Sequence, residues 1–156
     1  MMNDLVGIIR TESEVREAQV RLGELRARVR QVFVEGHRQY NPGWHLALDL
    51  RNMLVVSEAV ASSALLRTES RGGHTREDHP GLDPEWRHRV LVTHLARDGA
   101  PDDPVLPPIV VEPAERVAMR GDLLALFDLA ELEKYYTPSE LAAHPGNQPA
   151  PEGGTA

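Results

Sequence analysis

The sequence predicts a mainly α-helical protein: an antiparallel three-helix bundle, similar to a spectrin repeat, with a small β-hairpin and a disordered C-terminal tail. Aromatic residues make up only 4% of the chain and hydrophobic residues 41%, so the core must consist mainly of Leu, Val and Ala, a composition that favours helices. Apolar residues recur every three or four positions in the first half of the chain. Helix-capping residues precede two of these periodic segments.

The first periodic segment lies at the N-terminus. Met2, Leu5, Val6 and Ile9 lie at helical spacing, and no capping residue stands before them. We interpret this segment as the end of a helix, finishing near Arg10, that is longer in a parent protein. An ordinary frayed terminus is the alternative.

A long helix is predicted over residues 12–34. Thr11 and Glu14 fit a capping box, in which each side chain accepts a hydrogen bond from the backbone of the other residue. The apolar positions are three and four residues apart, as in a coiled-coil seam: Val15, Ala18, Leu22, Leu25, Val29 and Val32. We expect this seam to pack against a second helix of the same chain, and a homodimer is the alternative.

A second long helix is predicted over residues 42–67. Asn41 suits the N-cap, and Pro42 suits the first helical position. Leu, Val and Ala side chains lie on nearly all sides of this helix, which is typical of a helix buried on several sides. The first long helix covers one side only, so an external partner is expected to cover part of the rest.

The second half of the chain carries shorter elements. Residues 87–143 are predicted to hold a strand, a linker and short helices that pack on the bundle of residues 1–86. Alternating residues at 89–95 indicate the strand, and Ile109-Val110-Val111 is the candidate for its hairpin partner.

A short amphipathic helix is predicted over residues 121–135. Thr137 and Glu140 form a second capping box, which opens a helical stub through Ala143. Residues 144–156 are rich in Pro and Gly and predict the disordered tail.

The most informative segment follows the second long helix. Gly72 and Gly73 allow a tight turn, and basic and acidic side chains alternate around it. The alternating residues are Arg67, Arg71 and Arg76 with Glu69, Glu77 and Asp78. Such spacing predicts a compact ion-pair network or a docking face.

This segment resembles the R-x-E-S-R-G-x-H-x-R-x-D-x-P pattern of the succinate dehydrogenase/fumarate reductase flavoprotein family. The family places the pattern in a C-terminal three-helix domain that packs on the FAD domain. The resemblance implies that the segment is the domain-docking loop, formed by Arg67, Glu69, Ser70, Arg71, Gly72, His74, Arg76 and Asp78. Pro80, Asp83 and Trp86 match as well. The departures are His79, Leu82 and Pro84, and the resemblance is strong over residues 1–86 and weak beyond residue 111.

The resemblance also implies which parts of the family's chemistry are elsewhere. FAD and the residues that bind the dicarboxylate belong to the region before this domain, and no G-x-G turn occurs in the chain. We therefore predict no catalytic, cofactor-binding or metal-binding residue here, and no activity from this chain alone. The implied partners are an FAD-binding domain, in cis or in trans, and an iron–sulfur subunit. L-aspartate oxidase and adenylylsulfate reductase remain alternative parents.

Three other interpretations compete with this one. His74, His79, His88 and His94 are candidate metal ligands, but their spacing matches no recognised motif. Ser70, His74 and Asp78 are a conceivable hydrolytic triad without the usual nucleophile turn. A helical interaction module with no redox role is the main alternative function.

Charge and composition narrow the class of partner. The net charge of −7 argues against nucleic-acid binding, because phosphate contacts need clustered cations. No Cys is present, which excludes thiolate sites within the chain. No apolar run is long enough for direct membrane insertion, and no signal peptide is recognisable. A cytoplasmic location is expected, with peripheral attachment at the inner membrane face through partner subunits.

Overall fold

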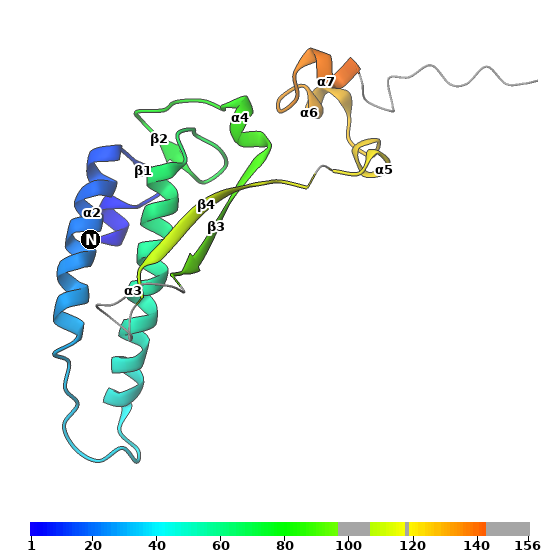
Figure 1. Ribbon diagram of the computed structural model, residues 1–156. Coiled ribbons are helices and arrows are strands. Elements are labelled where there is room, and N and C mark those ends of the chain that lie inside the picture. Colours follow the sequence, from blue (N-terminus) through cyan, green and yellow to red (C-terminus); the bar gives the residue numbers. More distant parts are fainter. Residues whose placement is uncertain (97–106, 118, 143–156) are drawn as a thin grey trace, which may run out of the picture.

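The computed structural model describes residues 1–96, 107–117 and 119–142. Two long helices run antiparallel, and a two-stranded hairpin lies along the second of them (Figure 1). The helices are α1 (Met2–Leu5), α2 (Glu12–Val29), α3 (Pro42–Leu66), α4 (Pro84–Arg87), α5 (Gly121–Leu124), α6 (Leu129–Leu132) and α7 (Pro138–Ala142). The strands are β1 (Ile9–Arg10), β2 (Thr75–Arg76), β3 (Arg89–Leu95) and β4 (Ile109–Glu115).

The mainly helical class is confirmed, but the described residues contain two long helices instead of three. The third side of the bundle is only partly covered. The four-residue α1 packs on α2, and the hairpin packs on α3.

Helix α2 begins as predicted. The Thr11 backbone N–H donates to Oε2 of Glu14 at 2.7 Å, and the Glu14 N–H donates to Oγ1 of Thr11 at 3.4 Å. The helix ends at Val29, five residues before the predicted end, and Val32 is exposed. Beyond Val29 the chain turns back toward α3 and passes through Gly36 at a φ of +87°. Val32 therefore lies in this turn and does not pack against α3 as part of the seam.

The core lies between α2 and α3. Val15, Ala18, Leu22 and Val29 of the predicted seam are buried there. Their partners on α3 and near the N-terminus are Leu54, Ala61, Ala64 and Val6. The seam therefore packs within the chain, as the sequence predicted.

A polar edge flanks this core. Nη1 of Arg26 on α2 donates to Oε2 of Glu58 on α3 at 2.6 Å, in a largely buried ion pair. The Gln19 amide donates to the Ser62 hydroxyl at 3.3 Å. These two contacts join α2 to α3 beside the core.

The N-terminal segment corrects one prediction. Helix α1 ends at Leu5, and Ile9 and Arg10 form a strand that pairs in parallel with Thr75 and Arg76. The chain bends at Gly7, where a helix was predicted, and a side chain there would approach the Asn3 carbonyl oxygen to 2.7 Å, so the bend favours glycine. The backbone groups beyond the bend are satisfied by the loop that follows α3.

The predicted hairpin is confirmed and is longer than expected. Strands β3 and β4 are antiparallel over seven residues each, with Val92 opposite Glu112. The predicted linker between them lies mostly outside the described residues.

The predicted helix over residues 121–135 is wrong as a continuous element. It is divided into α5 and α6, each of four residues, and the intervening Leu126 and Phe127 are exposed. A helix of one turn has little intrinsic stability, and Leu132 is the one buried side chain of residues 121–135 that could support a longer one. The stub α7 follows its predicted capping box, in which the Thr137 N–H donates to Glu140 at 2.8 Å. The predicted tail, residues 144–156, lies outside the described residues.

Candidate functional site

The loop that carries the family pattern runs from the end of α3 to α4. Its tip is a tight turn in which the backbones of Arg71 and His74 exchange hydrogen bonds of 2.8 and 3.0 Å. Gly72 within the turn has a φ of +57°, which explains the glycine at this position. The Ser70 N–H donates to the Gly81 carbonyl at 2.8 Å and closes the base of the loop.

Glu69 is the centre of one ion-pair cluster. Its side chain is fully buried and accepts hydrogen bonds from Nη1 of Arg67 at 2.5 Å and from Nε of Arg71 at 2.9 Å. The Asp83 N–H donates to the other carboxylate oxygen at 3.1 Å. Burial alone would raise the pKa of Glu69, but these donors outweigh it and hold the pKa below its usual value.

Arg76 is the centre of a second cluster and is fully buried. Its Nη1 donates to the carbonyls of Ala64 and Leu65 at 3.0 and 3.1 Å, so it caps the C-terminus of α3. Its Nε and Nη2 form a bidentate pair with Asp78 at 2.8 and 2.6 Å. Asp78 also accepts from the Glu12 N–H at the start of α2, at 3.1 Å. The loop therefore joins the end of α3 to the beginning of α2.

The Arg76–Asp78 pair changes the acidity of both groups. The hydrogen bonds from Arg76 hold the pKa of Asp78 far below its usual value. The same hydrogen bonds raise the pKa of Arg76, although burial opposes that change. Both changes favour the charged forms of the two side chains.

Ser70 and His74 make structural contacts. The Ser70 hydroxyl lies 2.8 Å from the Arg76 N–H and 2.9 Å from the His79 carbonyl. Nε2 of His74 lies 3.1 Å from the Arg67 carbonyl, and burial lowers the pKa of this imidazole. A neutral ring that donates through Nε2 satisfies that carbonyl.

The predicted docking-loop residues thus lie close together, and their charged side chains pair mainly with one another. Arg67, Glu69 and Arg71 share one cluster, and Arg76 with Asp78 forms the other. The hydrolytic triad is wrong, because Ser70, His74 and Asp78 each bond to other groups.

The four-histidine metal site is also not formed in the described part of the chain. The cluster of possible ligands found there is Glu12, Asp78 and His79, with ligand atoms within 4.8 Å of one another. Both Asp78 oxygens already accept from Arg76, and that guanidinium repels a cation. This cluster is therefore explained by an ion pair.

Arg10 is a residue that the sequence did not single out. It lies in β1, and its Nε is buried without a hydrogen-bond partner. Burial and the nearby Arg76 lower its pKa. A buried donor left unpaired costs about 1–3 kcal/mol, so this side chain needs an explanation. Only the pairing of β1 with β2 places it beside the loop, and no local sequence signal reports that pairing.

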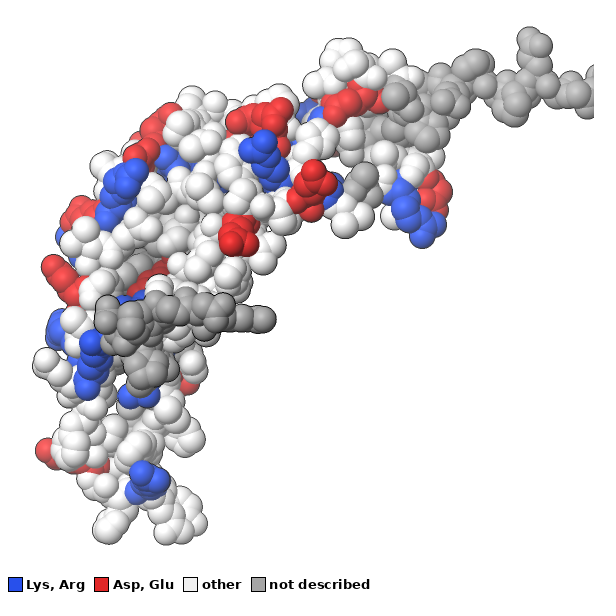
Figure 2. Space-filling view, viewed as in Figure 1, with Lys and Arg blue, Asp and Glu red and all other residues white. Residues whose placement is uncertain are grey.

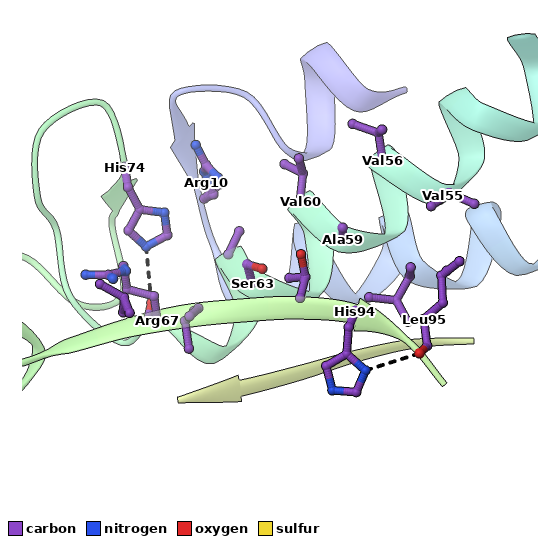
Figure 3. A pocket seen from close by; sticks show the side chains of 15 residues that line it. Arg10, Val55, Val56, Ala59, Val60, Ser63, Arg67, His74, His94 and Leu95 are labelled. Carbon is purple, nitrogen blue, oxygen red and sulfur yellow. Dashed lines mark hydrogen bonds between the residues drawn. The ribbon is translucent and has the colours of Figure 1, made fainter. Parts of the chain in front are cut away.

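Arg10 lines the end of a cleft of about 790 Å³ between α3 and the hairpin. The walls are apolar and include Val56, Val60 and Leu91. Figure 3 shows Arg10, Arg67 and His74 at one end of the cleft and His94 on the hairpin side. The cleft thus combines aliphatic walls with a basic end.

An exposed apolar stripe runs along α3 from the helix turn to this cleft. Leu46, Leu50, Met53, Val56 and Val60 follow helical spacing on one face, and Leu46, Met53 and Val56 are 69%, 63% and 61% exposed. Charged side chains of both signs gather instead along α2 and over the loop (Figure 2). The prediction that α2 covers only one side of α3 is confirmed.

These features define a class of protein. A helical hairpin is closed at one end by internally paired charges and presents bare aliphatic side chains along its second helix, as in a domain built to pack against a larger partner. No helix among the described residues combines the length and hydropathy required to span a bilayer.

The chain belongs to the family described as fumarate reductase flavoprotein C-term, whose model matches residues 1–117. The fumarate reductase flavoprotein subunit of Helicobacter pylori is 38% identical over 95 residues, which cover 60% of this chain and 13% of that protein. L-aspartate oxidase of Pseudomonas aeruginosa is 36% identical over 97 residues, which cover 62% of this chain and 17% of that protein.

A solved structure agrees with this assignment. A chain of Mycobacterium smegmatis Sdh1 in complex with UQ1 is 58% identical to this one, with a TM-score of 0.79, and the match covers 92% of this chain and 23% of that chain. The match to the two curated relatives named above spans only 13% and 17% of their lengths.

Proposed function

We propose that this chain acts as the C-terminal helical domain of a succinate/fumarate oxidoreductase flavoprotein and packs against an FAD-binding domain, in cis or in trans. The observation that carries the proposal is the exposed apolar stripe of α3, since burying five aliphatic side chains would supply a strong driving force for docking. The loop holds the ends of α2 and α3 together at one edge of this surface.

In this proposal the chain contributes no catalytic group. The described residues offer no glycine-rich strand-to-helix turn whose amides could receive a pyrophosphate, so they do not fit FAD. Their buried guanidinium groups are engaged in holding the fold, apart from Arg10. FAD binding, dicarboxylate binding and hydride transfer belong to the partner domain, and electrons pass to an iron–sulfur subunit.

The same proposal gives a location. The domain lies on the cytoplasmic side and reaches the inner membrane face only through partner subunits. L-aspartate oxidase or adenylylsulfate reductase as the parent would leave the docking role unchanged and alter only the substrate.

The docking test uses this chain and a family flavoprotein truncated before its C-terminal domain. We expect the two to co-elute in size-exclusion chromatography, with flavin absorbance in the complex peak. Met53→Asp should abolish the complex, because it places a charge in the middle of the apolar stripe, while leaving the helical circular dichroism unchanged. Val20→Asp, on the exposed side of α2, is the matched control.

The docking proposal fails if the wild-type chain does not bind, or if the two variants bind equally. The main alternative is a helical interaction module without a redox role, which the same apolar stripe would also serve. A stable homodimer of the wild-type chain that excludes the flavoprotein would favour that alternative.

A further inference from the structure

Among the described residues, one of the four guanidinium groups around the loop lacks a carboxylate partner. Arg67, Arg71 and Arg76 lie within 4.0 Å of carboxylates supplied by Glu69, Asp78 and Glu12. Arg10 makes no such contact with the residues that the structure describes, and its Nε is buried. The other three guanidinium groups are paired, and Arg10 lines the cleft.

The side chains near Arg10 include further positive charges. Burial, as the largest cause, and the positive charges of Arg10, Arg67 and Arg76 lower the pKa of His74, so all three guanidinium groups act on this imidazole. The cleft therefore has aliphatic walls along α3 and the unpaired Arg10 at one end (Figure 3).

We propose that the cleft between α3 and the hairpin receives a segment of the FAD-binding domain that carries aliphatic side chains and one Asp or Glu, whose carboxylate pairs with Arg10. This inference rests on the proposed docking function and adds the position and chemistry of the contact. The cleft opens beside the apolar stripe, because Val56 and Val60 belong to both. In this proposal one continuous partner surface covers the stripe, and the segment that projects from it occupies the cleft.

The apolar walls of the cleft favour a protein segment that carries a carboxylate over a free anion. The walls that lead to Arg10 are mostly aliphatic, and a small dicarboxylate would leave them exposed to water. A peptide segment buries these walls and neutralises the guanidinium together.

The experiment measures the affinity of the full chain for the truncated family flavoprotein by calorimetric titration. We expect Arg10→Glu to weaken binding at least tenfold and Arg10→Gln to weaken it less. Arg21→Glu, at an exposed Glu–Arg pair of α2, should leave binding unchanged. An Asp or Glu of the flavoprotein changed to Arg should restore binding to Arg10→Glu only.

The outcomes separate the two proposals. Absence of wild-type binding overturns the docking function itself. Wild-type binding with unchanged affinity for Arg10→Glu and Arg10→Gln overturns only the Arg10 contact. A rise in melting temperature caused by succinate alone, and lost in Arg10→Gln, would show that a free dicarboxylate occupies the cleft and would also overturn this inference.

Discussion

Buried charges determine the loop residue by residue. Glu69 and Arg76 are among the largest fully buried side chains, and each is surrounded by groups of opposite charge or by oriented backbone dipoles. A fully buried ion without such partners is strongly destabilising, because its lost hydration is not compensated. The pattern of alternating Arg and acid in the sequence therefore corresponds to two closed clusters.

His74 gives the loop a pH dependence. Burial, the largest cause, lowers its pKa in the folded state, so the unfolded chain takes up a proton more readily. The contribution to stability is thus complete above about pH 6.5, the ordinary pKa of histidine, and is lost as the pH falls below it. We expect His74→Gln to flatten the dependence of the free energy of unfolding between about pH 7 and pH 5.

Urea denaturation at several pH values measures this effect. His45→Gln, at an exposed position of α3, is the control and should retain the wild-type slope. Equal slopes for wild type and His74→Gln would contradict the assignment. Glu69 and Asp78 act in the same direction at lower pH, because their lowered pKa values make the carboxylates stabilising until they are protonated.

At the scale of elements, α2 and α3 differ in what their apolar residues do. Those of α2 form a single seam that is buried within the chain, whereas α3 buries Leu54, Ala61 and Ala64 and leaves its stripe exposed. The buried seam therefore holds α2 and α3 together, and the exposed stripe of α3 is available to a partner.

Substitutions within α2 test this division. Leu22→Ala should reduce the free energy of unfolding by about 2–5 kcal/mol, because it leaves a cavity in the only core between the helices that the described residues form. Val20→Ala, at a position that is 65% exposed, should change it by less than about 0.5 kcal/mol. Thermal and urea unfolding give both values, and similar losses for the two variants would disprove the packing of the seam.

At the scale of the whole molecule, the segment with α5, α6 and α7 extends away from the helical hairpin (Figure 1). It is anchored at Arg87, whose guanidinium donates to the Tyr135 carbonyl and to Glu140 and lies 4.7 Å from the centre of the Tyr136 ring. Arg87 is itself buried beside Trp86 in α4. This residue links the last part of the described chain to the loop.

Loss of the contact between Arg87 and Glu140 should destabilise the segment with α6 and α7 without unfolding the pair of helices α2 and α3. We expect Glu140→Gln to speed hydrogen exchange of the amides in α6 and α7, because the ion pair and the capping box are both weakened. Exchange in α2 and α3 should not change. Glu131→Gln, which removes only the exposed pair with Lys134, is the control, and equal effects would exclude the anchor.

The sequence predicted best where local signals are strong. Capping residues and apolar periodicity located the beginnings of α2 and α3 and the seam between them, and the Arg-acid pattern located the loop. It failed at residues 121–135, where Leu132 is the one buried side chain of the amphipathic pattern, and at the end of α2, where the reversal of the chain outweighed the pattern. Periodicity reports which face is apolar, but not whether another element lies opposite that face.

The sequence by itself determined the mainly helical class, the helix starts and the family resemblance, because each depends on residues close together in the chain. Only the tertiary structure decided that Ile9 and Arg10 pair with Thr75 and Arg76, which residues share an ion-pair cluster, and that Arg10 faces a cleft without a counter-ion. The pairing of Ile9 and Arg10 with Thr75 and Arg76 joins segments more than 60 positions apart, as does the hydrogen bond from Glu12 to Asp78, with a separation of 66. Their formation depends on how the whole chain packs, and no local pattern records it.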